Sequence, residues 1–220
     1  MTARETDARA VVEARAVVLG RIRAALAAAP PDPVIVPRDY DRQPLSGPGD
    51  VDRFAETVAD YRARVLRMGA GEISATVASL LGPGAAVVVP DDLPADWVAG
   101  VHVVRDDRCE PLPTGRLEAA DAVVTGCAIG VAATGTIVLD GGAGQGRRVL
   151  TLIPDHHICV IFAGQVVDTV PQGFDALDPL RPLTFISGPS ATSDIELERV
   201  EGVHGPRVLD VLIVESSPNA

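Results

Sequence analysis

The densest glycine segment of the chain spans residues 139–148 and reads LDGGAGQGRR. Its glycines are Gly141, Gly142, Gly144 and Gly146. Glycines adopt positive φ angles and let backbone amides approach a ligand, so with Arg147 the segment could hold a carboxylate or phosphate. It matches neither the dinucleotide pattern G-x-G-x-x-G nor a P-loop, because Arg147 stands where the last glycine or the lysine is required. The alternative is a hairpin loop, since residues 149–153 (VLTLI) look like a strand rather than the helix start that a phosphate cradle needs.

A second candidate segment, ISGPSATSDIE at residues 186–196, runs from a strand end through a glycine turn into helix-start residues. Ser190, Thr192 or Ser193 could cap that helix, whose free amides would then lie at the carboxyl end of a strand, where open α/β sheets bind ligands. Asp194 and Glu196 would stand beside these amides. The alternative is that the hydroxyls only cap the helix and the carboxylates only complement its dipole.

A third segment, EGVHGPR at residues 201–207, predicts a tight turn that exposes His204 and Arg207. His204 could act as an acid or base, although many loop histidines have no chemical role. Further upstream, His156 and His157 are neighbours at the start of a strand and should point to opposite faces, so we expect no chelated metal there. His156 could line a cleft or be a hydrogen-bonded structural residue.

Composition excludes several classes of chemistry. The chain contains no lysine, so all nineteen basic residues are arginine, and Schiff-base or pyridoxal-phosphate catalysis is ruled out. A formal charge of -11 argues against nucleic-acid binding. Three cysteines without a C-x-x-C pair argue against a bound zinc or iron–sulfur cluster, and a nucleophilic Cys127 lacks an identifiable base. Without an apolar segment long enough to span a bilayer or form a signal peptide, we expect a cytoplasmic protein.

The elements that must position these residues divide the sequence into a helical and an α/β part. Residues 1–82 are predicted to be mainly helical, with helices at 7–29, 51–68 and 72–81 and a proline-rich connector at 30–50. Asp50 is the expected cap of the second helix. Residues 83–220 are predicted to form an α/β domain, and the two parts together one compact unit. The expected strands are 85–89, 101–104, 122–124, 136–139, 149–153, 158–162, 183–186 and 208–214.

Taken together, five ordered segments between about Asp121 and Glu215 resemble the LUD-domain family, and within it the branch of lactate-utilisation C proteins. They are VTGCAIGVAATGTIVL (124–139), the glycine segment, LIPDHHI (152–158), GPSATSDIE (188–196) and GVHGPR (202–207). The resemblance implies a NagB/RpiA/CoA-transferase-like open sheet flanked by helices, with an N-terminal helical appendage. It also implies a role beside iron–sulfur proteins in bacterial oxidation of L-lactate to pyruvate, the clusters belonging to those partners and no cofactor to this chain.

The sequence departs from the family at Ala133, because relatives usually carry a glutamate in this position of the AATGT segment, residues 132–136. CoA transferases of the same broad fold use a glutamate in a comparable E-x-G setting to form a covalent thioester, which alanine cannot do. CoA transfer through position 133 is therefore excluded. Either Asp194 or Glu196 supplies the carboxylate, or the family's glutamate has a binding role that this chain does without.

The leading hypothesis is an accessory or ligand-binding subunit of lactate oxidation that binds an anionic small molecule between these loops. A stand-alone enzyme or binding protein for an acyl, CoA-like, nucleotide or folate-like anion is the alternative, and a purely structural adaptor is a third. The candidate acid–base residues are Asp194, Glu196 and His204. The candidate ligand-binding residues are Thr134, Gly135, Thr136, Gly142, Gly144, Gln145, Gly146, Arg147, His156, Gly188, Pro189, Ser190, Thr192, Gly205 and Arg207.

Overall fold

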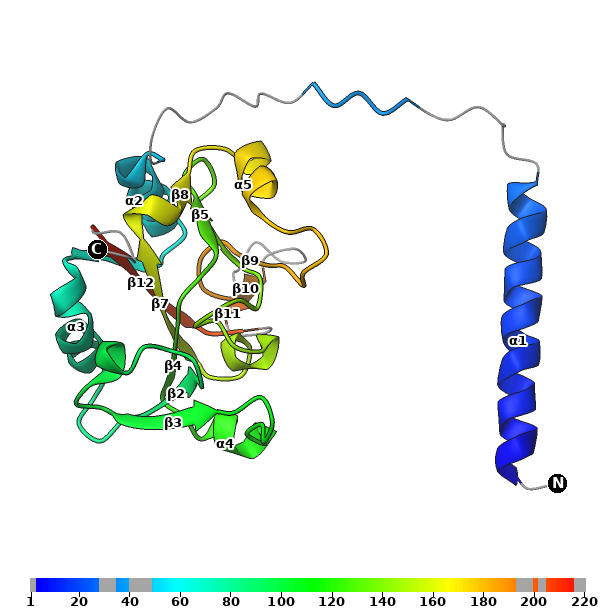
Figure 1. The fold of residues 1–220 in the computed structure, drawn as a ribbon, viewed down its shortest axis with the longest axis horizontal. Helices are drawn as coiled ribbons and strands as arrows, with labels where there is room; N and C mark the ends of the chain where they lie inside the picture. Colours follow the sequence, from blue (N-terminus) through cyan, green and yellow to red (C-terminus); the bar gives the residue numbers. More distant parts are fainter. Residues whose placement is uncertain (1–2, 28–34, 40–48, 193–199, 202–204, 216–220) are drawn as a thin grey trace. The chain divides into compact units, whose positions relative to one another are not determined.

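The computed structural model describes residues 3–27, 35–39, 49–192, 200–201 and 205–215, drawn in colour in Figure 1. The chain forms two units, residues 1–39 and residues 40–220. Residues 51–82 belong to the same unit as the sheet that follows them.

The first unit contains one helix, α1 (Ala3–Leu26), close to the helix expected at residues 7–29. Val17, Val18, Ile22 and Leu26 of this helix are exposed. Among the described residues, no helix combines the length and the apolar composition that a membrane span requires.

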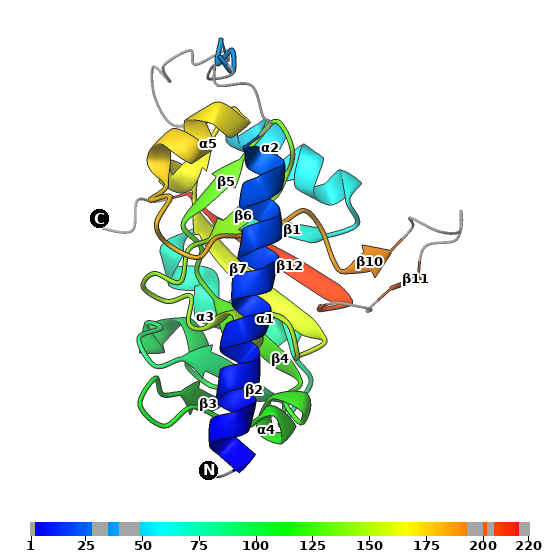
Figure 2. The same ribbon diagram turned by 90° about the vertical axis from the view of Figure 1, so that its right-hand side faces the viewer.

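The second unit is built on a six-stranded sheet in which all neighbouring strands are parallel. Figure 2 shows its strands in the order β1 (Arg64–Met68), β12 (Val208–Val214), β7 (His156–Phe162), β4 (Ala122–Thr125), β2 (Ala86–Pro90) and β3 (His102–Asp106). The central strands are rich in buried Val, Ile and Leu residues, as expected when both faces of a parallel sheet are covered. The predicted fold class, an α/β fold with a mostly parallel sheet flanked by helices, is confirmed.

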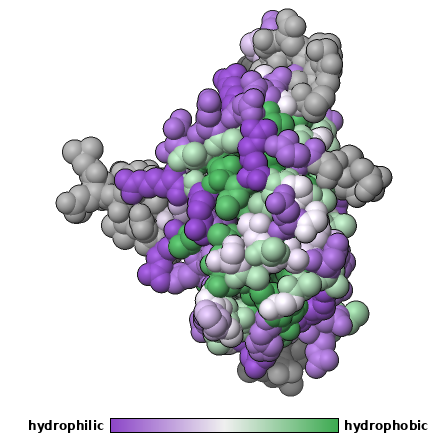
Figure 3. Space-filling view, turned by 90° about the vertical axis from the view of Figure 1, so that its left-hand side faces the viewer, coloured by the Kyte–Doolittle hydropathy of each residue, from purple (hydrophilic) through white to green (hydrophobic). Residues whose placement is uncertain are grey.

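One face of this sheet packs against α3 (Ile73–Leu80) and the 3₁₀ turn η2 (Ala95–Val98), through a core that includes Val77, Val124 and Leu212. Two further 3₁₀ turns, η1 (Ala70–Glu72) and η4 (Ala163–Gln165), lead into α3 and out of β7. On the side that carries α3, apolar side chains form separate patches bordered by hydrophilic ones (Figure 3). This pattern is typical of a covering layer that faces water.

The opposite face is covered by a second, four-stranded sheet and by short helices. The second sheet has the order β8 (Val166–Val167), β5 (Ile129–Val131), β6 (Thr136–Leu139) and β9 (Thr184–Ile186). The helical elements on this side are α2 (Val51–Asp60), α4 (Thr114–Glu118), η3 (Arg148–Thr151) and α5 (Val170–Ala176). Ile137 of β6 packs between the two sheets, whereas Val138 faces Leu177 beyond α5. Strands β5 and β6 of the second sheet are thus buried, whereas β9 is partly exposed. This sheet carries the loops of the candidate site.

Two predicted elements are corrected by the structure. The helix expected at residues 51–68 begins as predicted, with the Asp50 side chain accepting the Arg53 amide at 2.9 Å, but ends at Asp60. Arg62 takes a positive φ of 68° that breaks the helix, and residues 64–68 form strand β1 beside β12. The strand expected at residues 149–153 is the 3₁₀ turn η3 instead.

The helix expected to begin at Ser190, Thr192 or Ser193 falls largely on residues that the structure does not describe. Ala191–Thr192 is a short strand, β10, which pairs antiparallel with β11 (Val200–Glu201). Residues 193–199, with Asp194 and Glu196, lie outside the described residues, as does His204.

Candidate functional site

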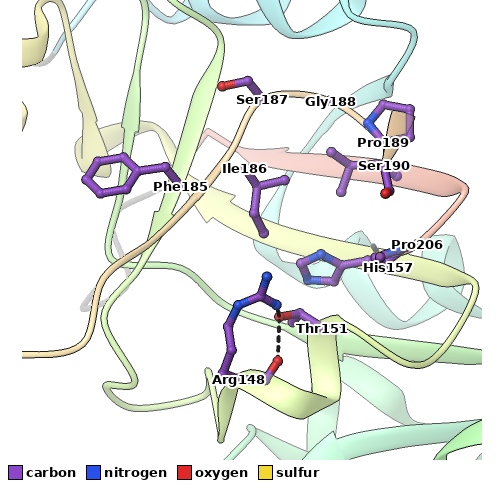
Figure 4. A pocket seen from close by; sticks show the side chains of 12 residues that line it. Arg148, Thr151, His157, Phe185, Ile186, Ser187, Gly188, Pro189, Ser190 and Pro206 are labelled. Carbon is purple, nitrogen blue, oxygen red and sulfur yellow. Dashed lines mark hydrogen bonds between the residues drawn. The ribbon is translucent and has the colours of Figure 1, made fainter. Parts of the chain in front are cut away.

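A cavity of about 240 Å³ lies where three separate segments of the chain meet, and we call it the hydroxyl cavity. Its polar walls are Arg148 and Thr151 of η3, His157 of β7, and Ser187 and Ser190 after β9 (Figure 4). Gly188, Pro189, Gly205 and Pro206 also line it. The Ser190 amide donates to the carbonyl oxygen of Pro206 at 2.8 Å, which joins two of the predicted loops. The predicted residues Gly188, Pro189, Ser190 and Gly205 are thus brought together.

Arg148 is the cation of this cavity. Its Nη1 atom donates to the Thr151 hydroxyl at 3.1 Å, and Figure 4 shows its side chain reaching from η3 toward Ile186. Partial burial lowers the pKa of Arg148 from its ordinary value. No carboxylate partner of Arg148 occurs among the residues that the structure describes. A desolvated guanidinium without a counter-ion is a favourable site for an anion.

His157 contributes an uncharged imidazole to the same cavity. Its ring is buried, and a hydrogen bond of 2.8 Å joins its Nε2 atom to the Thr125 hydroxyl. Burial, reinforced by the nearby charges of His156 and Arg148, lowers the pKa of His157 to about 3. The ring is therefore neutral at pH 7 and offers hydrogen bonds rather than charge.

A chain of hydroxyl groups connects the cavity to the turn between β5 and β6. The Ser187 hydroxyl lies 2.8 Å from that of Thr136, which lies 2.7 Å from that of Thr134. Gly135, in the same turn, takes a positive φ of 57° and packs directly on the backbone of Thr57 in α2. The predicted residues 134–136 therefore reach the cavity only through Ser187.

The glycine loop is held together by the carboxylate of Asp140, one of its own residues. The Asp140 carboxylate accepts hydrogen bonds from the Gly142 amide and from the Gln145 side-chain amide, each at 2.9 Å, and forms an ion pair with Arg181 at 2.6 Å. The Asp140 amide in turn donates to the Gln145 side-chain oxygen at 2.7 Å. The donors of Gly142 and Gln145 are thus used inside the loop, which leads into η3 and not into a hairpin strand.

Arg147 fastens this loop to the end of β3. Its guanidinium donates two hydrogen bonds of 2.7 Å to Asp106 and one of 2.6 Å to the carbonyl oxygen of Leu112. Burial raises the pKa of Asp106, but the hydrogen bonds from Arg147 and from the Leu112 amide outweigh it and hold that pKa below its ordinary value. Gly146, with a φ of 66°, lies where a Cβ would strike Leu150. Through these contacts Arg147 and Gly146 stabilise the conformation of the loop.

A second cavity of about 500 Å³ lies beside the glycine loop, and we call it the arginine cavity. Arg108, Arg147 and Arg148 line it, together with Gln145, Gly146, Thr151 and Thr184. Arg148 and Thr151 also line the hydroxyl cavity, so the two cavities adjoin. None of the described residues that line either cavity is a carboxylate.

A third cavity, of about 400 Å³, lies at the carboxyl ends of β2, β4 and β7. This is where the strand order reverses, the usual ligand position in an open α/β sheet. Its described lining includes Asp92, Asp96, Trp97 and Gly144 but no arginine, so it does not suit an anion. Cys127 also lines it, and a hydrogen bond to Cys159 together with burial raises the pKa of the Cys127 thiol, which keeps it protonated.

His156 and Arg207 do not line either of the two adjoining cavities. His156 is hydrogen-bonded through Nε2 to the buried carboxylate of Asp210 at 2.7 Å. The same carboxylate forms an ion pair with Arg64 at 2.6 Å. Arg207 pairs with Asp155. Only the backbone of Thr192 is described, in β10. Within the described ranges, no group of three or more His, Cys, Asp or Glu side chains is placed to hold a metal ion.

Sequence reasoning missed Arg148, Thr151, His157 and Ser187. Arg148 and Ser187 stand within or beside the quoted motifs, so their neighbourhood carried a signal. Nothing in the local sequence distinguishes Arg148 from its neighbour Arg147, which is paired with Asp106. That distinction depends on Asp106, which lies on β3.

The fold and the cavities define a mostly parallel α/β protein with an arginine-containing cleft, and comparison with known proteins gives its family. The family model described as LUD domain matches residues 115–214. "Lactate utilization protein C" of Deinococcus radiodurans is 45% identical over 210 residues, covering 92% of this chain and 96% of that protein. The chain belongs to the LUD-domain family, as its motifs suggested.

Two further matches are consistent with this assignment. "Lactate utilization protein C" of Shouchella clausii is 34% identical over 120 residues, about half of either chain. The crystal structure of a "duf162 family protein" from Deinococcus radiodurans superposes with a TM-score of 0.65 at 43% identity, covering 74% of this chain and 95% of that one.

Proposed function

We propose that this protein serves in L-lactate utilisation, as an accessory or ligand-binding subunit acting with iron–sulfur partner proteins in the oxidation of L-lactate to pyruvate. The observation that carries the proposal is the match to "Lactate utilization protein C" across nearly the full length of both chains. In this proposal the iron–sulfur clusters belong to the partners. The free thiols of Cys109, Cys127 and Cys159 suit the reducing cytoplasm in which we place it.

The binding part of the proposal concerns the cleft around Arg148. An anionic group would be held by its guanidinium, with hydrogen bonds from Thr151 and Ser190. Because a pKa of about 3 makes His157 a poor base and the described lining holds no carboxylate, any proton transfer would fall to Asp194, Glu196 or His204. Those residues adjoin the strands β10 and β11 in sequence.

Growth on L-lactate as sole carbon source tests the pathway. In a source strain with no second lactate oxidase, deletion of the gene should abolish growth, and the wild-type gene should restore it. Asp194→Ala should fail to restore growth if that carboxylate handles a proton. Full rescue by Asp194→Ala would favour a structural adaptor, and normal growth of the deletion strain would refute the lactate role.

The alternative is a stand-alone enzyme or binding protein for an acyl, CoA-like, nucleotide or folate-like anion. The observation that favours it is the size and arginine lining of the cavity beside the glycine loop. Such an enzyme would not form a glutamyl thioester at position 133, where the chain has Ala133.

A further inference from the structure

The hydroxyl cavity and the arginine cavity form one cleft, because Arg148 and Thr151 line both. A ligand that occupies one cavity can extend past Arg148 into the other. The two cavities measure about 240 and 500 Å³, and sites for drug-sized molecules measure about 300–1,000 Å³. L-Lactate, with three carbon atoms, would fill only a small part of this space.

Positive charge is in excess in the arginine cavity. Arg147 is neutralised by its bidentate pair with Asp106. Arg108 donates only to a backbone carbonyl oxygen, at 3.4 Å, and Arg148 only to a hydroxyl, at 3.1 Å, within the described part of the chain. Two guanidinium groups that have no counter-ion among the described residues match the charge of a phosphate group, which is close to −2 at neutral pH.

Away from Arg148, the hydroxyl cavity offers hydrogen bonds from uncharged groups. Ser187 and Ser190 present hydroxyl groups, and the His157 ring is neutral. Phe185 and Leu209 supply apolar walls. This compartment suits an uncharged polar group carried on an apolar stem.

We infer that the cleft binds an extended, phosphate-bearing small molecule, with its phosphate group between Arg108 and Arg148 and its uncharged end at Ser187 and Ser190. The inference rests on the anion site of the proposed function and assigns its ligand class. L-Lactate itself is then not the ligand of this chain.

Isothermal titration of the full-length protein with pyrophosphate, inorganic phosphate and L-lactate tests this assignment at low ionic strength, where screening is weak. We expect saturable binding of pyrophosphate, displaced by inorganic phosphate, and no saturable binding of L-lactate. Arg108→Gln and Arg148→Gln should each weaken pyrophosphate binding about 10- to 100-fold, the effect of losing one charged hydrogen bond. Arg116→Gln, an equal charge change at an exposed residue of α4, should leave it unchanged.

Circular dichroism and the urea midpoint check that the variants fold, which we expect because the described hydrogen bonds of Arg108 and Arg148 go to neutral acceptors. Each of four results would overturn the ligand class. These are unchanged pyrophosphate affinity in both Arg108→Gln and Arg148→Gln, an equal loss of affinity in Arg116→Gln, no pyrophosphate binding by the wild-type protein, and binding of L-lactate that depends on Arg148. The growth experiment is separate. Arginine-dependent pyrophosphate binding together with normal growth of the deletion strain would refute the lactate role and support the ligand class. Loss of growth without pyrophosphate binding would support the lactate role and refute the ligand class.

Discussion

At the scale of single residues, His157 links the site to the stability of the fold. Its pKa is about 3 in the folded chain and about 6.5 when unfolded, so the unfolded chain binds more protons between these values. The contribution is complete above pH 6.5 and is lost as the pH falls toward 3. Between pH 7 and 4.5 the wild-type protein should lose about 2–3 kcal/mol of unfolding free energy from this group.

Replacement of the imidazole isolates this effect. His157→Gln keeps a hydrogen-bonding group near Thr125 but cannot titrate, so its unfolding free energy should fall less between pH 7 and 4.5 than that of wild type. Urea unfolding at both pH values measures the difference. His102→Gln removes an exposed histidine of β3 and serves as the control. A pH dependence in His157→Gln equal to that of wild type would contradict the assignment of a neutral buried ring.

The neighbouring arginines 147 and 148 show how far sequence can predict a site. The motif located the correct loops, and Gly188, Ser190 and Gly205 do line one cavity. The sequence could not show that Arg147 is paired with Asp106 while Arg148 faces the cleft. That difference arises from tertiary contacts between segments that lie about 40 residues apart.

At the scale of elements, the buried parallel strands were predictable because runs of Val and Ile bounded by turn residues leave few alternatives. Residues 136–139 and 208–214 are strands with the predicted bounds. Strand β1 was missed because Val65 and Met68 also fit a helical stripe, and only pairing with the distant β12 decides between the two. Residues 149–153 are mostly apolar but do not form a strand. Leu150 lies in a 3₁₀ turn and is buried in the core from there, so the apolar run did not require an extended conformation.

The turn between β5 and β6 gives a prediction at this scale. Gly135 has a φ of 57°, and a Cβ there would lie 2.7 Å from the Thr57 backbone. Gly135→Ala should therefore lower the unfolding free energy by about 2–4 kcal/mol, because steric strain adds to the left-handed backbone. Gly84→Ala has a similar φ of 79° but no atom within 4 Å, and should cost only about 1 kcal/mol. Equal losses in urea unfolding would show that the turn does not dock on α2.

At the scale of the whole molecule, the buried apolar clusters of the described chain draw on residues between Phe54 and Val214, all in the second unit. The apolar side chains of α1 described by the structure contribute to none of them. The stability of the sheet should therefore depend on residues 40–220.

Deletion of residues 1–39 tests this division. Because no described core residue is removed, calorimetry should show one cooperative transition whose Tm changes by less than about 4 °C, the shift that 1 kcal/mol produces in a domain of this size. Deletion of residues 1–69 also removes α2 and β1, with Phe54 and Val58, and should abolish the cooperative transition. A large fall in Tm after the shorter deletion would mean that α1 stabilises the sheet unit, and would make its exposed Val17, Val18, Ile22 and Leu26 the surface to mutate next.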